Sequence, residues 1–326
     1  MAGADAAPES GTGSSLAVEV VAAVIRRADG AILFAQRPEG KVYAGWWEFP
    51  GGKVEEGESR GEALARELHE ELGIQVLTSR PWLTREYVYP HATVRLHFRI
   101  VTGWQGEPQS REGQALAWQH LEAPLVEPML PANEPILASL RLPVEYAISA
   151  AAALGEAAFL ARLEERLSAG LRLLQLREKS MDPAALGRMA AQVMPLARAH
   201  GARVLLNGEP GLARDLGVDG VHLTSERLMR TQARPPGLMV AASCHDAGQL
   251  AHAGRLGLDF AVLGPVCPTP SHPGEPGMGW SAFETLLKDN LLPVYAIGGM
   301  SGASLEQAWQ CGAHGVAMIS AAWAQA

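Results

Sequence analysis

Long hydrophobic runs and cysteines are both scarce in this sequence, and each shortage excludes a class of protein. No apolar run reaches the roughly 20 residues that cross a bilayer, so we expect no membrane partner. The three cysteines, Cys244, Cys267 and Cys311, have the spacing of neither a zinc site nor a disulfide framework. A reducing compartment is therefore favoured, and we expect a cytoplasmic protein. Residues 1–15 lack a basic segment followed by an apolar one, which predicts a disordered tail rather than a signal peptide.

Positive charge is also in short supply. The 27 Lys and Arg residues against 35 Asp and Glu give a net charge of -8. Proteins that bind duplex nucleic acid need a basic surface, so we expect no such partner. A single nucleotide remains compatible with this balance, because one positive pocket is enough to bind it. The 326 residues, 48% of them hydrophobic, are sufficient for about two globular domains.

The first part of the chain, residues 16–142, mixes strands with one strong helix. We expect strands over 16–25 and 31–35, joined by a turn at Asp29–Gly30 into a hairpin. A helix is predicted over 59–72, with a capping box of Ser59 and Glu62 at its start and Gly73 at its end. Two further elements are expected downstream: a strand over 93–102 and a short closing helix over 133–140.

The second part, residues 143–326, alternates strands with helices. Helical periodicity is clear over 157–169 and 183–199. The strand candidates are 144–149, 171–177, 203–207, 220–223, 239–244, 260–264, 294–297 and 315–320. Eight such units favour a (β/α)8 TIM barrel, although an open doubly wound sheet alternates in the same way. The boundary at 142–145 has no flexible linker, so we expect the two domains to pack together.

Three glutamates share one face of the predicted helix over 59–72. Glu67, Glu70 and Glu71 lie at positions i, i+3 and i+4, where their carboxylates repel each other. A divalent cation relieves that repulsion, and hard oxygen ligands select Mg²⁺, with Mn²⁺ as the alternative. The preceding pair Gly51–Gly52 permits a tight turn that brings a backbone carbonyl close to the metal. Because Mg²⁺ held by carboxylates binds substrate phosphates, the pattern points to diphosphate chemistry.

The longer pattern Gly-x5-Glu-x7-Arg-Glu-Leu-x-Glu-Glu-Leu-Gly-Ile, from Gly52 to Ile74, resembles the Nudix box. The resemblance implies an α/β/α sandwich and Mg²⁺-dependent hydrolysis. It also implies that Arg66 and Glu58 form an ion pair and that Lys53 touches a phosphate. The metal ligands it implies are Gly51, through its carbonyl, Glu67, Glu70 and Glu71.

Three other segments resemble the MutT branch of that family, which hydrolyses oxidised guanine nucleotides. They are 47–53, 111–114 and 130–136. By this resemblance Glu112 is a further metal ligand, and Asn133 reads the purine with an amide that both donates and accepts. Phe49 would form an apolar wall and Arg37 would contact a phosphate or the base. The implied reaction converts a nucleoside triphosphate, 8-oxo-dGTP above all, to the monophosphate and pyrophosphate, with Glu70 or Glu112 as the general base.

Each assignment has a structural alternative. The glutamates of the helix would otherwise form a solvated face, which the complete box pattern disfavours. Glu112 would otherwise be a surface acid, Asn133 a helix N-cap and Phe49 an ordinary core residue. The stretch 89–92, where a residue flanking the base is expected, does not match the MutT branch. The substrate is therefore less well defined than the reaction.

The second part resembles thiamine phosphate synthase and its relative TenI, a thiazole tautomerase. The segments that carry this resemblance are 175–179, 205–208, 220–223, 263–270 and 296–299, at the carboxyl ends of predicted strands, where barrel sites lie. Backbone amides near Gly298 and Gly299 would bind a phosphate. The implied site comprises Gln175, Arg177, Lys179, Asn207, Ser243, His245, Gly298, Gly299 and Ser320.

Departures from the synthase pattern argue against synthase activity. Gly208 and Arg227 stand where two metal-binding aspartates are expected, and His272 replaces a phosphate-binding lysine. His245 is a candidate general acid and base, or else it caps a helix. The barrel is therefore either a TenI-like enzyme or a non-catalytic module that binds a thiazole or thiamine phosphate.

Three functions remain open at this point. The first is a hydrolase that removes 8-oxo-dGTP. The second is a hydrolase of a thiamine-type diphosphate whose product the barrel binds or isomerises. The third is a hydrolase regulated by a ligand of the barrel. Resemblance to both families implies a homodimer.

Overall fold

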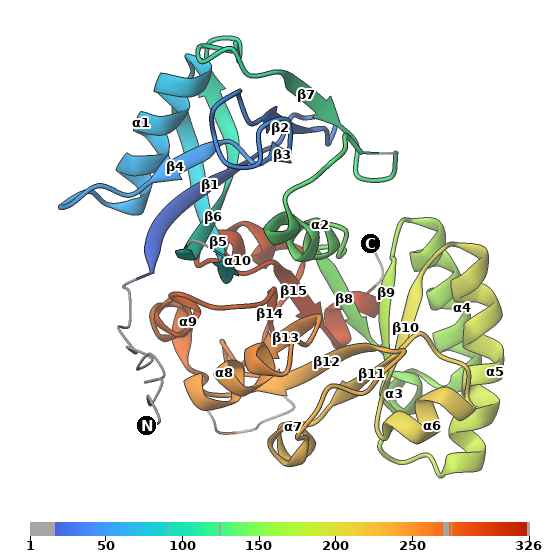
Figure 1. The fold of residues 1–326 in the computed structure, drawn as a ribbon. Coiled ribbons are helices and arrows are strands. Elements are labelled where there is room, and N and C mark those ends of the chain that lie inside the picture. The colour runs from blue at the N-terminus through green and yellow to red at the C-terminus, as the bar shows by residue number, and fades with distance from the viewer. Residues whose placement is uncertain (1–16, 91, 124, 270–273, 275, 325–326) are drawn as a thin grey trace, which may run out of the picture.

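Two domains follow one another in the computed structural model, which describes residues 17–90, 92–123, 125–269, 274 and 276–324. Figure 1 shows the first domain lying against one end of the second. The tail predicted over 1–15 lies outside the described residues, and so does His272. No helix in the part of the chain that is described has the length and apolar character needed to span a membrane.

The first domain contains two sheets. The larger has the order β4 (Gly51–Lys53), β1 (Val18–Ile25), β6 (Ala92–Gln105), β5 (Gln75–Tyr89), with only the central β1–β6 pair parallel. The smaller has the order β3 (Trp47–Glu48), β2 (Ile32–Gln36), β7 (Leu116–Gln119). The predicted hairpin of β1 and β2 is therefore wrong. The two strands share a single bridge between Arg26 and Ile32 and then enter different sheets.

Alternation along β1 explains the layers of this domain. Val21, Ala23 and Ile25 pack in the cluster that contains the leucines of α1 (Arg60–Leu72). The intervening Ala22 and Val24 pack in the cluster that contains α2 (Glu134–Leu140). Successive side chains of a strand point to opposite faces, so β1, which is apolar at every position from Val20 to Ile25, is covered on both sides. The predicted α/β/α sandwich is confirmed.

The helix α1 begins and ends where the sequence indicates. The Ser59 side chain accepts a hydrogen bond from the Glu62 N–H at 3.3 Å, and the Glu62 carboxylate accepts one from the Ser59 N–H at 2.9 Å. Gly73 ends the helix with φ of 72°, a conformation in which glycine carries no steric cost. The glutamates of the Nudix box therefore lie on a helix whose first and last residues are both fixed by capping interactions.

The second domain is a closed barrel of eight parallel strands. Strand β8 pairs with both β9 and β15, so the open-sheet alternative is wrong. The strands are β8 (Glu145–Ile148), β9 (Leu173–Leu176), β10 (Arg203–Asn207), β11 (Gly220–Leu223), β12 (Met239–Cys244), β13 (Phe260–Leu263), β14 (Val294–Ala296) and β15 (Gly315–Met318). The helices are α3 (Ala151–Leu154), α4 (Glu156–Ser168), α5 (Pro183–Ala199), α6 (Pro210–Asp215), α7 (Ser225–Arg230), α8 (Ala247–Arg255), α9 (Gly279–Leu287) and α10 (Leu305–Gln310).

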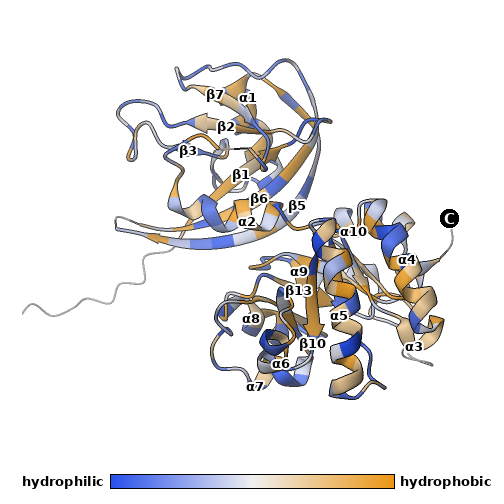
Figure 2. Cartoon of the chain, turned by 90° about the vertical axis from the view of Figure 1, so that its right-hand side faces the viewer, coloured by the Kyte–Doolittle hydropathy of each residue, from blue (hydrophilic) through white to orange (hydrophobic). Residues whose placement is uncertain are grey.

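Aromatic rings fill the centre of the barrel. Tyr146, Phe260 and Tyr295 lie with ring centroids 5.0 to 5.8 Å apart. A separate apolar cluster lies between the strands and the surrounding helices. Figure 2 shows this pattern as hydrophobic strands such as β13 enclosed by helices of mixed hydropathy. Burial on both faces explains why the strands read as short apolar runs in the sequence.

The first domain packs on the barrel end where the strands begin. Trp82 Nε1 donates to His314 Nδ1 at 3.3 Å, and the guanidinium of Arg80 lies 4.8 Å from the centre of the Trp309 ring. Arg60 forms an ion pair with Asp289 at 2.7 Å. Since Asp289 and His314 precede β14 and β15, the carboxyl ends of the strands face away from the first domain. The expected packing between domains is present.

Candidate active site and barrel cavity

The first domain contains a cavity of about 430 Å³. It runs between the strand β1, the segment 37–46 and the start of α2. Residues predicted for both the metal end and the base end of a nucleotide site line it. Those residues are Arg37, Phe49, Gly51, Lys53, Glu71 and Asn133.

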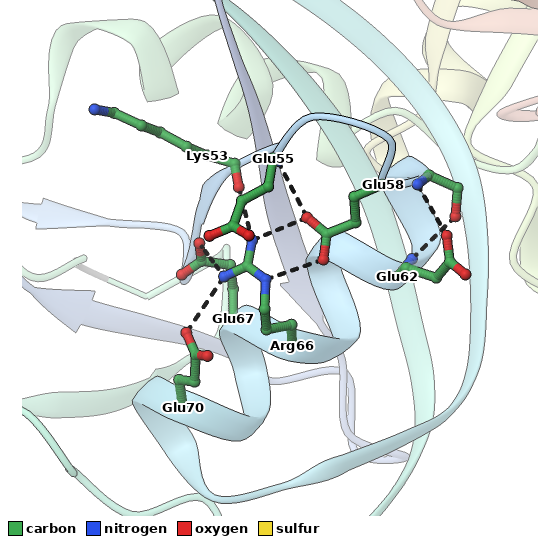
Figure 3. Close-up of polar contacts among 8 residues, drawn as sticks. Lys53, Glu55, Glu58, Glu62, Arg66, Glu67 and Glu70 are labelled. Atoms are coloured by element: carbon green, nitrogen blue, oxygen red, sulfur yellow. Dashed lines mark hydrogen bonds and ion pairs between the residues drawn. The ribbon is translucent and has the colours of Figure 1, made fainter.

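Arg66 organises one side of the predicted metal site (Figure 3). Its Nε and Nη2 atoms donate to the Glu58 carboxylate, each at 3.0 Å, so the ion pair implied by the Nudix resemblance is present. Its Nη1 atom donates to Glu67 at 2.9 Å and to Glu70 at 3.3 Å. The Glu58 and Glu67 carboxylates raise the pKa of Arg66. Two of the predicted metal ligands are thus paired with one guanidinium, which also pairs with Glu58.

Glu71 points away from Arg66 and into the cavity. Its carboxylate accepts a hydrogen bond from the Gly51 N–H at 3.2 Å. Burial, together with nearby carboxylates, raises the pKa of Glu71 to about 7, although the hydrogen bond from Gly51 lowers it. Glycine is required at Gly51 in the facing turn, because its φ is 146° and a Cβ there would lie 2.1 Å from the Val21 carbonyl oxygen. The turn therefore lies as close to β1 as a backbone can.

Glu112 reaches the same region from the loop between β6 and β7. Two hydrogen bonds join the loop to the end of α1. The Glu71 carbonyl accepts one from Gln114 Nε2 at 3.0 Å and one from the Arg111 N–H at 3.1 Å. The Glu112 carboxylate pairs with Lys41 Nζ at 2.9 Å. Lys41 was not among the predicted site residues.

The donor set fits a hard divalent cation, since every donor is a carboxylate or carbonyl oxygen. Within the described ranges, however, no three His, Cys, Asp or Glu side chains converge closely enough to hold a metal ion. The reason is visible in their partners, because the carboxylates turn toward Arg66, the Gly51 N–H and Lys41. Rotation of these side chains is required before they meet at one ion.

The base end of the cavity is apolar with one buried amide. Asn133 is only 4% exposed and makes no capping bond to α2, and its Nδ2 lies 3.6 Å from Met129 Sδ. Phe49 is both core and cavity wall, with ring centroids 5.0 Å from Phe34 and 5.6 Å from Phe98. Asn133 therefore presents its amide to the cavity rather than to the helix.

Arg37 is less free than its predicted role suggests. Its Nη1 donates to the Glu48 carboxylate at 2.6 and 2.8 Å, and its Nε donates to the Val42 carbonyl at 2.7 Å. Glu48 and Tyr43 line the cavity too and were missed in the sequence. Tyr43 packs against Tyr89 at 5.8 Å, so the segment that does not match MutT lies beside the site.

The barrel holds a second cavity of about 540 Å³ at the carboxyl ends of its strands. All nine residues predicted for the barrel site line this cavity. No Asp or Glu is found among the described lining residues, whereas Arg177 and Lys179 are. The cavity therefore presents positive charge without a set of metal ligands.

A chain of hydrogen bonds forms part of the cavity wall. Asn207 Nδ2 donates to Gln175 Oε1, and Gln175 Nε2 donates to the Tyr146 hydroxyl, both at 3.1 Å. The Tyr146 hydroxyl lies 3.2 Å from His222 Nδ1, and His222 Nε2 lies 2.9 Å from Ser243 Oγ. Burial lowers the pKa of His222 to about 3, so the ring is neutral. Tyr146 then donates to Nδ1 and Nε2 donates to Ser243, which leaves the Ser243 O–H to donate into the cavity.

His245 is oriented by the barrel backbone. Its Nδ1 lies 2.6 Å from the Gly264 carbonyl, and its ring lines the cavity. The helix-capping alternative does not apply, because Asp246 is the N-cap of α8. At the place of the expected metal-binding aspartates, Arg227 forms an ion pair with Glu209. A solvent-exposed ion pair thus stands where the synthase pattern has a metal site.

Comparisons with known proteins agree with these two sites. The NUDIX domain model matches residues 21–139 and the thiamine monophosphate synthase model matches residues 145–322. The CTP pyrophosphohydrolase of Escherichia coli is 45% identical over 120 residues, which are 37% of this chain and 88% of that protein. The 8-oxo-dGTP diphosphatase of Haemophilus influenzae is 39% identical over 120 residues, again 37% and 88%.

A thiamine-phosphate synthase of Thermus thermophilus is 36% identical over 168 residues, which are 50% of this chain and 81% of that protein. Each half of the chain thus has relatives that it covers over most of their length. The chain belongs to the NUDIX family through its first domain, a hydrolase of diphosphate bonds, and to the thiamine monophosphate synthase family through its barrel.

Proposed function

We propose that the first domain is an Mg²⁺-dependent nucleoside triphosphate pyrophosphohydrolase whose preferred substrate is 8-oxo-dGTP. The observation that carries this proposal is the Asn133 amide, which is buried and faces the cavity that Glu71 also lines. Buried amides normally have hydrogen-bond partners. Among the described residues this side chain has only a weak bond to Met129 Sδ, so a purine edge is a fitting partner.

Different residues of the cavity would contact different parts of the nucleotide. Asn133 orients the base, and Phe49 excludes water from it. Lys53 binds the phosphate chain at the other end. Glu67, Glu70, Glu71, Glu112 and the Gly51 carbonyl would hold the cation. When bound, Mg²⁺ neutralises the phosphates and the leaving group and activates water.

Glu70 and Glu112 are the candidates for the group that accepts the proton of the attacking water. Glu70 has a side chain 56% exposed, and Glu112 one 42% exposed, so both are open to solvent. Arg66 sits 3.3 Å from Glu70 and holds it near the helix. Substitution of each by glutamine separates the two roles, because the base variant loses kcat while a metal-ligand variant loses metal affinity.

A second substrate is favoured by one specific observation. The relative with 45% identity is named for CTP rather than for a purine nucleotide. A thiamine-type diphosphate is a third candidate, supported by the barrel alone. The barrel cavity opens away from the first domain, which does not favour direct transfer between the sites.

We propose for the barrel a metal-independent site for a thiazole or thiamine phosphate, without synthase activity. Three features support it: the cations Arg177 and Lys179, the backbone turn at Gly298–Gly299, and the Arg227–Glu209 pair in place of metal ligands. His245 and Ser243 face the same cavity and would move or donate protons.

Steady-state hydrolysis with Mg²⁺ across a panel tests the first proposal. The panel contains 8-oxo-dGTP, dGTP, CTP, other nucleoside triphosphates and thiamine diphosphates, with Glu70→Gln as the control. The expected result is that 8-oxo-dGTP leads in kcat/KM by at least about tenfold. A lead for CTP would overturn the purine role of Asn133, and a lead for a thiamine diphosphate would place both domains in one pathway.

A further inference from the structure

Lys41 lies on a loop that is held firmly at its base. The loop spans residues 37–46, between β2 and β3. The Arg37 N–H donates to the Trp46 carbonyl at 2.8 Å, and the Gly45 N–H donates to the Arg37 carbonyl at 2.9 Å. Tyr43 packs against Trp46 with centroids 5.3 Å apart. The backbone that carries Lys41 is therefore held at both ends of the loop, while its side chain is 48% exposed.

The ammonium of Lys41 enters a region of negative charge. Its Nζ lies 2.9 Å from the Glu112 carboxylate, across a separation of 71 residues in the sequence. Glu48 and Glu71 line the same cavity as Lys41. Arg66 pairs with Glu67 and Glu70 on the other side of this carboxylate group. Lys41 thus offsets the negative charge of Glu112, as Arg66 does for the carboxylates of α1.

We propose that Lys41 alternates between two anions: Glu112 in the metal-free enzyme, and the phosphate chain of the nucleotide once a divalent cation has taken Glu112. The inference rests on the proposed metal-dependent hydrolysis. The same side chain would then have two opposing effects on the enzyme. It competes with the metal in the free enzyme, and it strengthens substrate binding in the metal-bound enzyme.

The geometry allows this exchange at low cost. Both partners of the Lys41–Glu112 pair are about half exposed, and exposed ion pairs contribute little to stability. A divalent cation that gathers several carboxylates therefore displaces the ammonium readily. Lys41 stays beside the cavity when released, and Lys53, the predicted phosphate ligand, lines that cavity as well. A lysine acts on phosphate as a mobile point charge, which suits a residue that must move.

Two measurements on Lys41→Met test the proposal. Mn²⁺ binding to the full chain without nucleotide, followed by the electron paramagnetic resonance signal of free Mn²⁺, is expected to tighten about two- to fivefold. The KM for 8-oxo-dGTP, or for CTP if the panel ranks it first, is expected to rise about fivefold at saturating Mg²⁺. Lys41→Arg keeps the charge, so it should change both values less.

Arg230→Met is the matched control. It removes one positive charge from an exposed ion pair with Glu226 in the barrel, so net charge changes equally. Neither value should move in this variant. Unchanged Mn²⁺ affinity in Lys41→Met, or an unchanged KM, overturns the exchange. If the unaltered protein does not bind Mn²⁺ at all, the proposed metal dependence itself fails, and this result is distinguishable because it precedes any comparison of variants.

Discussion

The two cavities of this molecule, each of which we propose to bind a phosphorylated ligand, differ in their acidic residues: Glu48 and Glu71 line the first, and the described lining of the second has none. At the first, carboxylates from α1 and the β6–β7 loop pair with Arg66 and Lys41. The second has Arg177, Lys179 and a neutral hydrogen-bond chain, with no acidic residue among the lining residues that are described. Carboxylates bind phosphate only through a metal ion, whereas lysine and arginine side chains bind it directly. The difference predicts which site depends on metal.

Removal of divalent cations should therefore separate the two sites completely. With excess EDTA we expect hydrolysis by the first domain to fall to background and to return with Mg²⁺. Binding of thiazole phosphate by the barrel should be unchanged under the same conditions, as measured by calorimetry. Loss of barrel binding in EDTA would show that the Arg227–Glu209 pair does not replace a metal site.

Acid should weaken the boundary between the two domains. Burial lowers the pKa of His314 from 6.5 to about 4, and its neutral Nδ1 accepts from Trp82. As the pH falls below 6.5 the unfolded chain gains a proton that the folded chain does not. Stability that is present above pH 6.5 is therefore lost down to pH 4, by about 2 kcal/mol between pH 6.5 and 5.

Urea unfolding at pH 7 and pH 5 measures this loss. His314→Gln is the matched variant, since an amide can both accept from Trp82 and donate to the Leu142 carbonyl as the imidazole does. Its pH dependence should be smaller, although His222 keeps its own lowered pKa. An equal dependence in both proteins would contradict the role of His314.

Replacing the buried amide tests the base end of the first cavity. Asn133→Ala should lower kcat/KM for 8-oxo-dGTP by roughly 10- to 100-fold, because the loss of hydrogen bonds to a buried partner costs about 1–3 kcal/mol. Asn133→Asp keeps the hydrogen-bond acceptor and loses the donor. Comparing it with Asn133→Ala therefore separates the contributions of donor and acceptor to the loss in kcat/KM. An equal loss for CTP and for purine nucleotides would indicate a structural role.

The smallest effect is expected at the mouth of the barrel. Lys179→Met should weaken thiazole phosphate binding by about tenfold, since one charge-assisted bond among several is removed. Hydrolysis by the first domain should not change. Lys288→Met, a lysine outside the barrel cavity, is the control. Hydrolysis that responds to thiazole phosphate in the unaltered chain and not in Lys179→Met would instead support a regulatory barrel.

Most of the barrel could be predicted from the sequence, because its strands are buried on both faces and read as short apolar runs. The predicted ranges of β10, β11 and β12 match the structure at both ends. The longest strand, β5, was not predicted. It contains Pro81 and register shifts near Thr78 and Leu83, which interrupt any simple alternation. The turn between β1 and β2 likewise did not reveal that the strands join different sheets.

Some residues of the candidate sites could likewise be predicted from the sequence, and others could not. The glutamates of α1 could be predicted because their spacing is local to one helix. Lys41 could not, because its partner Glu112 is 71 residues away and no pattern joins them. Glu48 was hidden for a related reason, since its pairing with Arg37 depends on how β2 and β3 meet. Contacts across sheets and loops require the fold itself.

The placement of the first domain on the starting ends of the barrel strands has a kinetic consequence. The barrel mouth lies at the opposite end, and the described residues that line its cavity all belong to the barrel. Any small molecule that served both sites would have to escape into bulk solution between them. It would be diluted there, and an unrelated enzyme added in excess could intercept it. Joining the two domains in one chain would then secure equal amounts of both rather than direct delivery of a product from one site to the other.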